Sequence, residues 1–389
     1  MNKVGLSVCY DTKNFGSQLQ VLATINQIEK LGYDTEIIRY KKKISLSLII
    51  QNIPRLFNGQ YINGLIKSNK KNKLLSKYPE IVDNIKIRNN RFSKFANDNF
   101  INVSNFYYGW HSLKNAAKKN YDMFLCGSDQ LWLPSNLESH FYTLEYAPNE
   151  KPKISYATSF GVGEIPWYQK NRTKKYLNRL NHISTRELKG AEIINDLTGR
   201  DVQVVCDPTL LLTKEEWDKL IPNHTVVNEK YIFCYFLGEN ENHRLQAQKL
   251  ANQFNLKIVT IPFLDNYVEI DRFFGDYSLY DIDTNDFVNL IRNAEFVLTD
   301  SFHGTIFSIL NNKKFITFNR FDSKSKNSRN SRIDSLFKVL NIQERRYNSK
   351  LELSEQIIKD IDYGTVINNV ESLRNDSINY LTNALAASE

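Results

Sequence analysis

The chain has only four cysteines and six histidines, and neither set has the spacing of a disulfide framework or a metal site. The cysteines lie far apart, without a C-x-x-C pair, and each is within or beside an apolar run: Cys9, Cys126, Cys206 and Cys234. This pattern predicts reduced core thiols in a cytosolic protein. No two histidines have the H-x-x-x-H or H-E-x-x-H spacing of a zinc site, so we expect neither a metal nor a cofactor.

Long hydrophobic runs are also lacking. No apolar segment approaches the roughly 20 residues that span a bilayer. The chain also starts directly with a strand-like segment, without the regions of a signal peptide. We therefore expect a cytoplasmic protein that is soluble or attached peripherally to the inner face of a membrane. Its 389 residues, 41% of them hydrophobic, suggest about two domains.

Positive charge is concentrated in one segment. The formal net charge is +8, yet residues 39–94 hold 14 lysines and arginines against two acids, which leaves −4 for the rest of the chain. This asymmetry predicts a local anionic partner: nucleic acid, an anionic membrane surface or a phosphorylated substrate. No RNA- or DNA-binding signature accompanies the charge, so we expect no nucleic acid. A solvated basic face is the alternative.

Strand-like and helical segments alternate along the chain. Val4 to Cys9 forms an apolar strand, residues 17–31 carry helical spacing closed by Gly32, and residues 33–40 form the next strand. This is a β-α-β unit, the building block of a parallel sheet. Polar clusters follow several later strands, at 127–130, 158–161, 185–187 and 207–209. In open α/β sheets ligands bind outside these carboxyl ends.

After a helix that begins near Lys214, the pattern restarts with strands at 231–237, 257–261, 295–298 and 314–318. We expect an α/β fold of two Rossmann-like domains facing a cleft. The N-terminal domain, 1–213, would carry a basic helical insert at about 41–100. The C-terminal domain, 214–389, would end in a helix that packs back onto the first.

The segment T-D-S-F-H-G-T, residues 299–305, is the most informative feature of the chain. It follows an apolar strand and precedes an apolar helix, so it places His303 at a helix N-terminus, where backbone N–H groups favour an anion. Histidine is also suited to moving a proton near neutral pH. The pattern therefore indicates an enzyme acting on a phosphate or carboxylate. A packed turn whose histidine only caps the helix is the alternative.

Seven motifs in order carry a family resemblance. They are N-F-G with L-Q at 14–20, G-S-D-Q-L-W at 127–132, I-S-Y-A-T-S-F-G at 154–161, I-S-T-R-E at 183–187, D-P-T-L-L-L at 207–212, N-A-E-F-V at 293–297 and T-D-S-F-H-G at 299–304. Each motif is weak alone, but together they make the chain resemble the polysaccharide pyruvyl transferases from about residue 3 to 346.

The resemblance implies a fold similar to GT-B glycosyltransferases and an activity. The activity is transfer of a pyruvyl group from phosphoenolpyruvate, as donor substrate, onto two hydroxyls of a saccharide as a ketal, with release of phosphate. The implied acceptor is a capsular or exopolysaccharide repeat unit, often linked to a polyprenyl diphosphate. A lysine-rich helical insert would suit contact with an anionic membrane surface.

The family links the arginine of S-x-R-E and the histidine before glycine to phosphoenolpyruvate, which implies Arg186 and His303 here. His303 is our candidate for proton transfer or for the acid that assists phosphate departure. The helix after Gly304 offers backbone N–H groups, and Thr305 offers a hydroxyl, to the same anion. Some members carry arginine-leucine before the histidine, whereas this chain has serine-phenylalanine. We therefore expect Lys324 and Arg332 to supply the missing cation.

Two carboxylates are candidates for the base that activates the sugar hydroxyl or orients His303. They are Asp129 and Asp300, with a turn aspartate and a helix N-cap as the respective structural alternatives. The candidate acceptor-binding residues are Asn14, Gly16, Gln20, Gln130 and Trp132, and the indole of Trp132 would stack on a sugar ring. Two other functions stay open. One is a nucleotide-sugar glycosyltransferase whose His303 turn holds a diphosphate. The other is a non-catalytic membrane- or glycan-binding protein.

Overall fold

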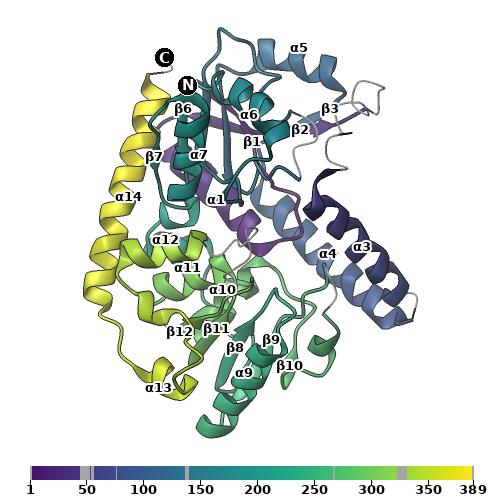
Figure 1. Cartoon of the computed structure of the whole chain (residues 1–389), viewed down its shortest axis with the longest axis vertical. Coiled ribbons are helices and arrows are strands. Elements are labelled where there is room, and N and C mark those ends of the chain that lie inside the picture. The colour runs from purple at the N-terminus through teal and green to yellow at the C-terminus, as the bar shows by residue number, and fades with distance from the viewer. Residues whose placement is uncertain are drawn as a thin grey trace. The chain divides into compact units, whose positions relative to one another are not determined.

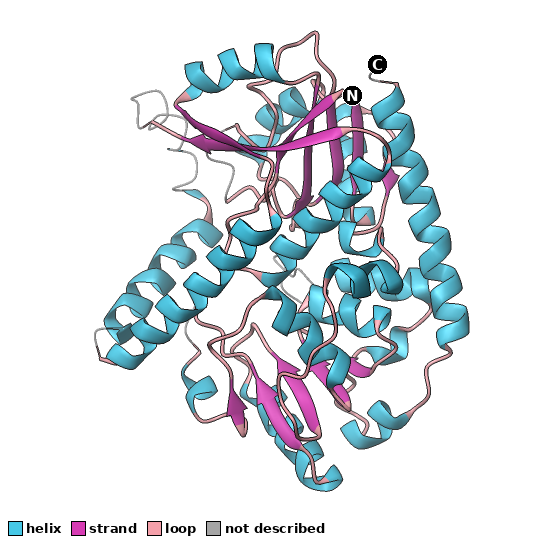
Figure 2. Cartoon of the chain, turned by 180° about the vertical axis from the view of Figure 1, so that it is seen from behind, coloured by secondary structure: helices cyan, strands magenta, loops and turns pink. Residues whose placement is uncertain are grey.

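The computed structural model describes residues 2–43, 53, 57–75, 77–135, 140–265, 268–321 and 331–387. The chain divides into two compact units, each built on one parallel sheet (Figures 1 and 2). Unit 1 comprises Met1–Ile66, Ala96–Leu211 and Ser372–Glu389, and unit 2 comprises Lys67–Phe95 and Leu212–Glu371. The predicted α/β class, with two Rossmann-like parts as in a GT-B-like fold, is confirmed.

Unit 1 contains a seven-stranded sheet in the order β3-β2-β1-β4-β5-β6-β7, with every neighbouring pair parallel. Its strands are β1 (Lys3–Ser7), β2 (Asp34–Lys41), β3 (Val103–Tyr108), β4 (Met123–Asp129), β5 (Lys153–Thr158), β6 (His182–Thr185) and β7 (Gln203–Val204). Its helices include α1 (Phe15–Lys30), α5 (Trp110–Asn120), α6 (Lys170–Leu177) and α7 (Leu188–Thr198). The interior strand β5 is buried along its whole length, as expected of a parallel strand covered on both faces.

Unit 2 contains a five-stranded parallel sheet in the order β10-β9-β8-β11-β12. Its strands are β8 (Tyr231–Tyr235), β9 (Lys257–Thr260), β10 (Tyr277–Ser278), β11 (Phe296–Thr299) and β12 (Lys314–Thr317). Its helices include α8 (Lys214–Leu220), α9 (Glu241–Phe254), α10 (Thr284–Asn293), α11 (Phe302–Leu310), α12 (Ser331–Leu340) and α13 (Leu353–Ile358).

Two helices lie within the predicted basic insert, α3 (Gly59–Leu75) and α4 (Pro79–Asn99). The insert is predicted to belong to the N-terminal domain, whereas residues 67–95 cluster with unit 2. Within unit 2, α4 is held by an ion pair between Arg88 and Asp265, with 2.8 Å between the charged atoms.

The last helix, α14 (Tyr363–Ala386), contributes its C-terminal part to unit 1. There the Arg374 guanidinium donates to the Leu210 carbonyl at 2.7 Å, and the Tyr380 hydroxyl donates to the Ser155 carbonyl at 3.0 Å. These bonds join α14 to two segments far away in the sequence.

The four cysteines all lie in described segments, and none is in a disulfide. Burial raises the pKa of the Cys126 thiol to about 12, so it is protonated at neutral pH. No helix in the described ranges is both long enough and apolar enough to cross a bilayer.

Candidate active site

Each sheet contains one point at which the chain reverses the direction in which it adds strands. In unit 1 this switch point lies between β1 and β4, because β2 and β3 follow on one side and β5 to β7 on the other. In unit 2 it lies between β8 and β11 for the same reason. Ligands of open parallel sheets bind outside the carboxyl ends of the strands at such points. The predicted motif residues lie at both.

At the switch point of unit 1, Asp129 ends β4 with a positive φ of 77°. This left-handed conformation is uncommon for a residue with a side chain. The carboxylate accepts a hydrogen bond of 2.9 Å from the hydroxyl of Ser17, which lies in the first turn of α1. The side chain of Asp129 is 29% exposed. Asp129 is thus a fixed carboxylate with access to solvent, as a general base requires.

Arg186 follows β6 and is almost fully buried. Its guanidinium donates to the carboxylate of Asp207 at 2.6 Å and lies 3.9 Å from that of Asp129. Burial on its own would lower the pKa of Arg186, but Asp207, Asp129 and then Glu187 raise it above its ordinary value. The cation is therefore permanent and held in one orientation.

Other predicted residues complete this network. The Gln20 amide donates to Asp207 at 2.5 Å and to the Ser128 hydroxyl at 3.2 Å. The Asn14 side chain caps α1 by accepting from the Ser17 N–H at 3.1 Å. The side chains of Asn14 and Gln20 therefore make hydrogen bonds that hold the fold together. Gly16 is buried in the first turn of the same helix.

Gln130 lies against the backbone that follows β5. Gly161 has a φ of +61°, and a Cβ atom there would lie 2.5 Å from the Gln130 amide nitrogen. A larger residue would therefore displace the Gln130 amide, and the positive φ also favours glycine here. The polar clusters after β4 and β5 are thus brought together at one edge of the sheet, as the sequence predicts.

Trp132 corrects one sequence prediction. Its side chain is fully buried, packs against Phe160 and Tyr176 at ring-centroid distances of 5.2 and 5.7 Å, and donates from its indole N–H to the Tyr142 carbonyl. A ring enclosed in this way cannot stack on a sugar. Its immediate neighbours, Leu131 and Leu133, are also buried, so the local run belongs to the core.

At the switch point of unit 2, the buried carboxylate of Asp300 bridges two loops. Its two oxygens accept from the backbone N–H groups of Leu237 and Gly238, at 2.8 and 2.9 Å, just after β8. The predicted alternative, a helix N-cap, is wrong, because the Ser301 hydroxyl caps α11 through the Gly304 N–H. With both oxygens engaged, Asp300 is better suited to positioning the His303 turn than to accepting a proton.

His303 lies in the first turn of α11, with its ring edge-to-face against Phe302 at 5.5 Å and with 9% of the residue exposed. Gly304 is needed beside it, since a Cβ atom there would lie 2.7 Å from the Thr299 hydroxyl. The Thr305 hydroxyl is fully buried, donates to the Ser301 carbonyl and shares a hydrogen bond with Thr317. Both bonds of this hydroxyl are to residues of unit 2, so the predicted role of Thr305 in binding the phosphoenolpyruvate anion is wrong.

Arg320 is a cation that the sequence analysis missed. It follows β12, donates to the Asp300 carbonyl at 2.9 Å and lies 3.3 Å from the Asp300 carboxylate, with 23% of its side chain exposed. Its position shortly after a predicted strand is the signal in the sequence that could have identified it. Of the two cations named instead, Arg332 lies over the ring of Phe302, the residue before His303, at 5.3 Å. Lys324 lies outside the described residues.

A second histidine in unit 2, His243 of α9, predicts a pH effect on stability. It is packed against Phe236 and Phe318, and burial lowers its pKa from 6.5 to about 4, with Asp300 opposing this shift and Arg244 adding to it. Between these pH values the unfolded chain binds a proton that the folded chain does not. We therefore expect about 3 kcal/mol of stability to be lost as the pH falls from 6.5 to 4.

Chemical denaturation of the wild type and of His243→Leu at several pH values measures this loss. The substituted protein should lose less stability over that window, while His111→Leu, an exposed control, should behave as the wild type does. Parallel pH curves for all three proteins would contradict the assignment.

The described segments contain no group of three or more His, Cys, Asp or Glu side chains that could hold a metal ion.

The comparisons with known proteins agree on the fold and give a family. The model of the family described as polysaccharide pyruvyl transferase matches residues 14–323 of this chain. No curated protein matches it. Among solved structures, the N-terminal domain of Candida albicans trehalose-6-phosphate phosphatase has a TM-score of 0.50 and 9% identity, over 100% of this chain and 97% of that one.

Two further structures are similar at lower scores. UDP-GlcNAc 2-epimerase from Neisseria meningitidis has a TM-score of 0.46 and 11% identity, over 99% of this chain and 97% of that one. The glycosyltransferase SnogD from Streptomyces nogalater has a TM-score of 0.44 and 10% identity, over 100% and 99%. At such identities a likeness concerns the fold alone.

Proposed function

The chain belongs to the polysaccharide pyruvyl transferase family, and from that premise we propose that it transfers the pyruvyl group of phosphoenolpyruvate to two hydroxyls of a saccharide. The products are a pyruvate ketal and inorganic phosphate. The observation that best supports this donor is the turn that carries His303 into α11, because two cations contact residues of that turn: Arg320 lies 3.3 Å from the Asp300 carboxylate, and Arg332 lies over the Phe302 ring. A proton-transfer group beside positive charge suits an enol phosphate that also carries a carboxylate.

The proposed reaction has three steps. A sugar hydroxyl loses its proton to a base as its oxygen attacks the phosphate-bearing carbon, and the methylene carbon of the donor takes up a proton from an acid. The bond between the phosphate-bearing carbon and the phosphate oxygen then breaks, and phosphate leaves. Finally the second hydroxyl attacks the same carbon and loses its proton, which closes the ketal. The reaction needs a base for the hydroxyls and an acid for the methylene carbon or the phosphate.

We assign the acid to His303 and the base to Asp129. Imidazole is the side chain most often used to transfer protons in enzymes, and the N-terminus of α11 favours the phosphate that His303 would serve. Asp129 has a partly exposed carboxylate, and its hydrogen bond from Ser17 holds it in place. Arg186 has the planar fork that binds a carboxylate or phosphate in two places at once.

On the acceptor side, Gln130 is the predicted residue whose amide is best suited to a sugar hydroxyl, because Gly161 lets it lie along the end of the sheet. Asn14 and Gln20 contribute by fixing α1 and Asp207.

Acceptor-dependent phosphate release tests the reaction. The enzyme is incubated with phosphoenolpyruvate and a panel of galactosides, glucosides and mannosaminides, and phosphate is measured over time. We expect release only with particular acceptors. Equal release with and without every acceptor would instead indicate a phosphatase.

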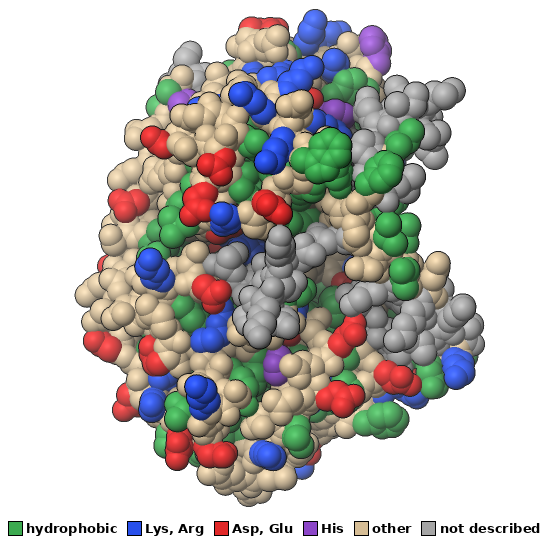
Figure 3. All heavy atoms as spheres, in the orientation of Figure 1, with side chains coloured by type: hydrophobic (Ala, Val, Ile, Leu, Met, Phe, Trp, Pro, Cys, Tyr) green, Lys and Arg blue, Asp and Glu red, His purple; other side chains and the backbone are tan. Residues whose placement is uncertain are grey.

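We also propose that the acceptor is a lipid-linked capsular or exopolysaccharide repeat unit, taken at the inner face of the cell membrane. Helix α3 exposes apolar side chains at spacings of three and four residues, Ile62, Leu65 and Ile66, within a lysine-rich segment. Apolar side chains with flanking lysines suit an anionic bilayer surface. Basic and acidic side chains are interspersed on the face shown in Figure 3. An anionic membrane would therefore be attracted by a local basic segment and not by this face as a whole.

Reversing three charges of α3 tests the membrane contact. We expect Lys70→Glu, Lys71→Glu and Lys73→Glu together to weaken co-sedimentation with phosphatidylserine vesicles roughly a hundredfold, at about 1 kcal/mol per lysine. The same reversal at Lys114, Lys118 and Lys119 of α5 is the matched control. Equal binding by both triple variants would contradict a membrane role for α3.

A further inference from the structure

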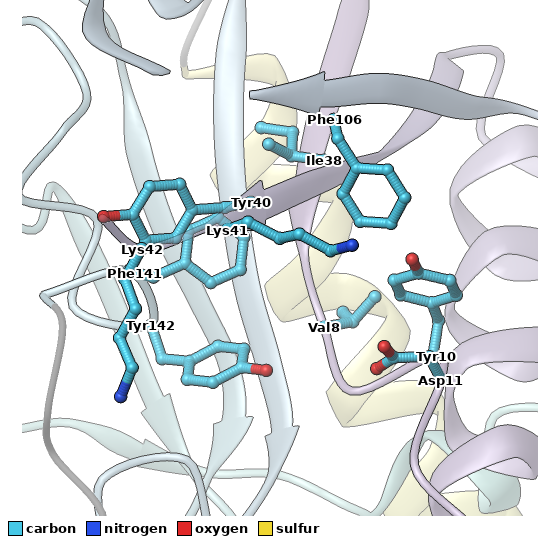
Figure 4. Close-up of a pocket in the computed structure, with 10 residues that line it drawn as sticks. All are labelled: Val8, Tyr10, Asp11, Ile38, Tyr40, Lys41, Lys42, Phe106, Phe141 and Tyr142. Carbon is cyan, nitrogen blue, oxygen red and sulfur yellow. The ribbon is translucent and has the colours of Figure 1, made fainter. Parts of the chain in front are cut away.

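Unit 1 contains a cavity of about 420 Å³ that no motif of the sequence predicted. It opens at the carboxyl ends of β1, β2 and β3, on one side of the switch point (Figure 4). Its volume lies within the range of about 300–1,000 Å³ that is usual for small-molecule sites. Five aromatic rings and a lysine dominate its lining: Tyr10, Tyr40, Phe106, Phe141, Tyr142 and Lys41.

The rings hold one another in place. Tyr40 stacks on Phe141 at a centroid distance of 5.5 Å and an angle of 24°, and Phe141 meets Tyr142 edge-to-face at 5.1 Å. Across the cavity, Phe106 packs against the Arg39 guanidinium at 4.5 Å. A wall of fixed rings offers broad apolar faces at little cost in side-chain entropy.

The charge in the cavity is positive. Figure 4 shows the Lys41 side chain extending between Phe106 and Tyr10, and its ammonium group lies 4.3 Å from the centre of the Phe106 ring. No carboxylate in the described part of the chain forms an ion pair with Lys41. Lys42 adds a second positive charge, and Asp11 is the one acid in the lining. An anionic group on the ligand would therefore be attracted to Lys41.

One wall of the cavity is tied to the residues that follow β1. Tyr142 in this wall accepts a hydrogen bond from the Cys9 thiol at 3.4 Å. Burial, and next the charge of Asp129, raise the pKa of Cys9 to about 12, so the thiol is protonated at neutral pH.

We propose that this cavity binds the saccharide acceptor, as a hexose that carries an anionic group. The rings pack against the apolar face of the sugar, and Lys41 pairs with its phosphate or carboxylate. This inference rests on the proposed function, since it names the acceptor class. It assigns acceptor recognition to residues outside the family motifs.

Direct binding without phosphoenolpyruvate tests the inference separately from the reaction. The probes are three derivatives of each hexose in the acceptor panel. They are the 1-phosphate, the methyl glycoside of the corresponding uronic acid, and the neutral methyl glycoside. Their dissociation constants are measured by titration NMR for the wild type, Lys41→Met, Lys41→Arg and Tyr40→Leu. Methionine keeps the stem that packs on Phe106 and removes only the charge. Lys175→Met, on the exposed face of α6, is the control.

We expect at least one anionic form to bind at least fivefold more tightly than the neutral glycoside. Lys41→Met should remove that preference, Lys41→Arg should retain it, and Tyr40→Leu should weaken both classes. The anion that Lys41 distinguishes, phosphate or carboxylate, identifies the acceptor type. Equal affinities that Lys41→Met leaves unchanged would overturn the inference, as would tighter, Tyr40-dependent binding of uridine diphosphate. Failure of phosphate release with intact anionic-hexose binding would refute the donor and leave this site standing.

Discussion

Replacement of His303 with alanine is expected to lower kcat for pyruvyl transfer by about 10²–10⁴-fold, the usual contribution of a positioned proton-transfer group. His303 lies in the first turn of α11, where Asp300 ties the preceding loop to the end of β8. Ser301, not His303, caps that helix, so the predicted alternative of a purely capping histidine is wrong. Steady-state kinetics with saturating phosphoenolpyruvate and acceptor measure the loss.

A second readout separates catalysis from packing. The pH profile of the wild type should contain an ionisation that disappears in His303→Gln, because glutamine keeps hydrogen bonding but cannot transfer a proton. His111→Ala, an exposed histidine on α5, is the control and should retain full activity. If His303→Gln kept the wild-type kcat and pH profile, the acid would have to be another group.

Replacement of Arg186 with methionine is expected to destabilise the protein by about 3–5 kcal/mol, the cost of removing one partner of a buried ion pair. The Asp207 side chain is fully buried and would lose its cation. Burial would then favour its protonated form. Denaturant titration measures the free energy of unfolding, and the KM for phosphoenolpyruvate measures any direct role of the guanidinium.

The double variant Arg186→Met with Asp207→Asn distinguishes these contributions. It should recover part of the stability, since no buried charge remains unpaired, but none of the donor affinity. Arg179→Met removes a half-buried guanidinium that donates to carbonyl groups and has no buried carboxylate partner among the described residues, and it should cost about 1 kcal/mol. A stability loss for Arg186→Met no greater than that of this control would contradict the buried network.

The sequence predicts the scaffold well because strand order follows from local patterns. Apolar strands followed by polar clusters imply parallel strands whose carboxyl ends share an edge. Asp129 ends β4 and Asp300 directly follows β11, and each bonds across a switch point, to Ser17 and to the loop after β8 respectively. The strand order predicts that both lie at such an edge, although it does not predict the partners of their carboxylates.

The roles of individual side chains were less predictable, because they depend on contacts distant in sequence. Trp132 belongs to a motif, yet its contacts with Phe160 and Tyr176 make it a core residue. The Thr305 hydroxyl follows a plausible anion site but bonds to Thr317 of the next strand. The pattern of apolar residues along the sequence predicts neither contact, because both depend on how separate helices and strands pack against one another.

The cavity of unit 1 is a site that the sequence alone does not reveal. Its rings come from separate segments, among them Tyr10, Tyr40, Phe106 and Phe141, and no spacing rule joins them. The parallel alignment of β1, β2 and β3 brings Tyr10, Tyr40 and Phe106 together, and the chain after β4 adds Phe141. Sites assembled in this way become visible with the fold.

The most direct test of the central claim follows the donor carbon. The enzyme is given phosphoenolpyruvate labelled in its carbon skeleton together with an acceptor from the panel, and the isolated saccharide is analysed by carbon NMR. The account predicts that the label appears in the saccharide as an acid-labile ketal carbon, with one phosphate released for each ketal formed. An unlabelled saccharide that instead gains a sugar from an added nucleotide sugar would contradict it.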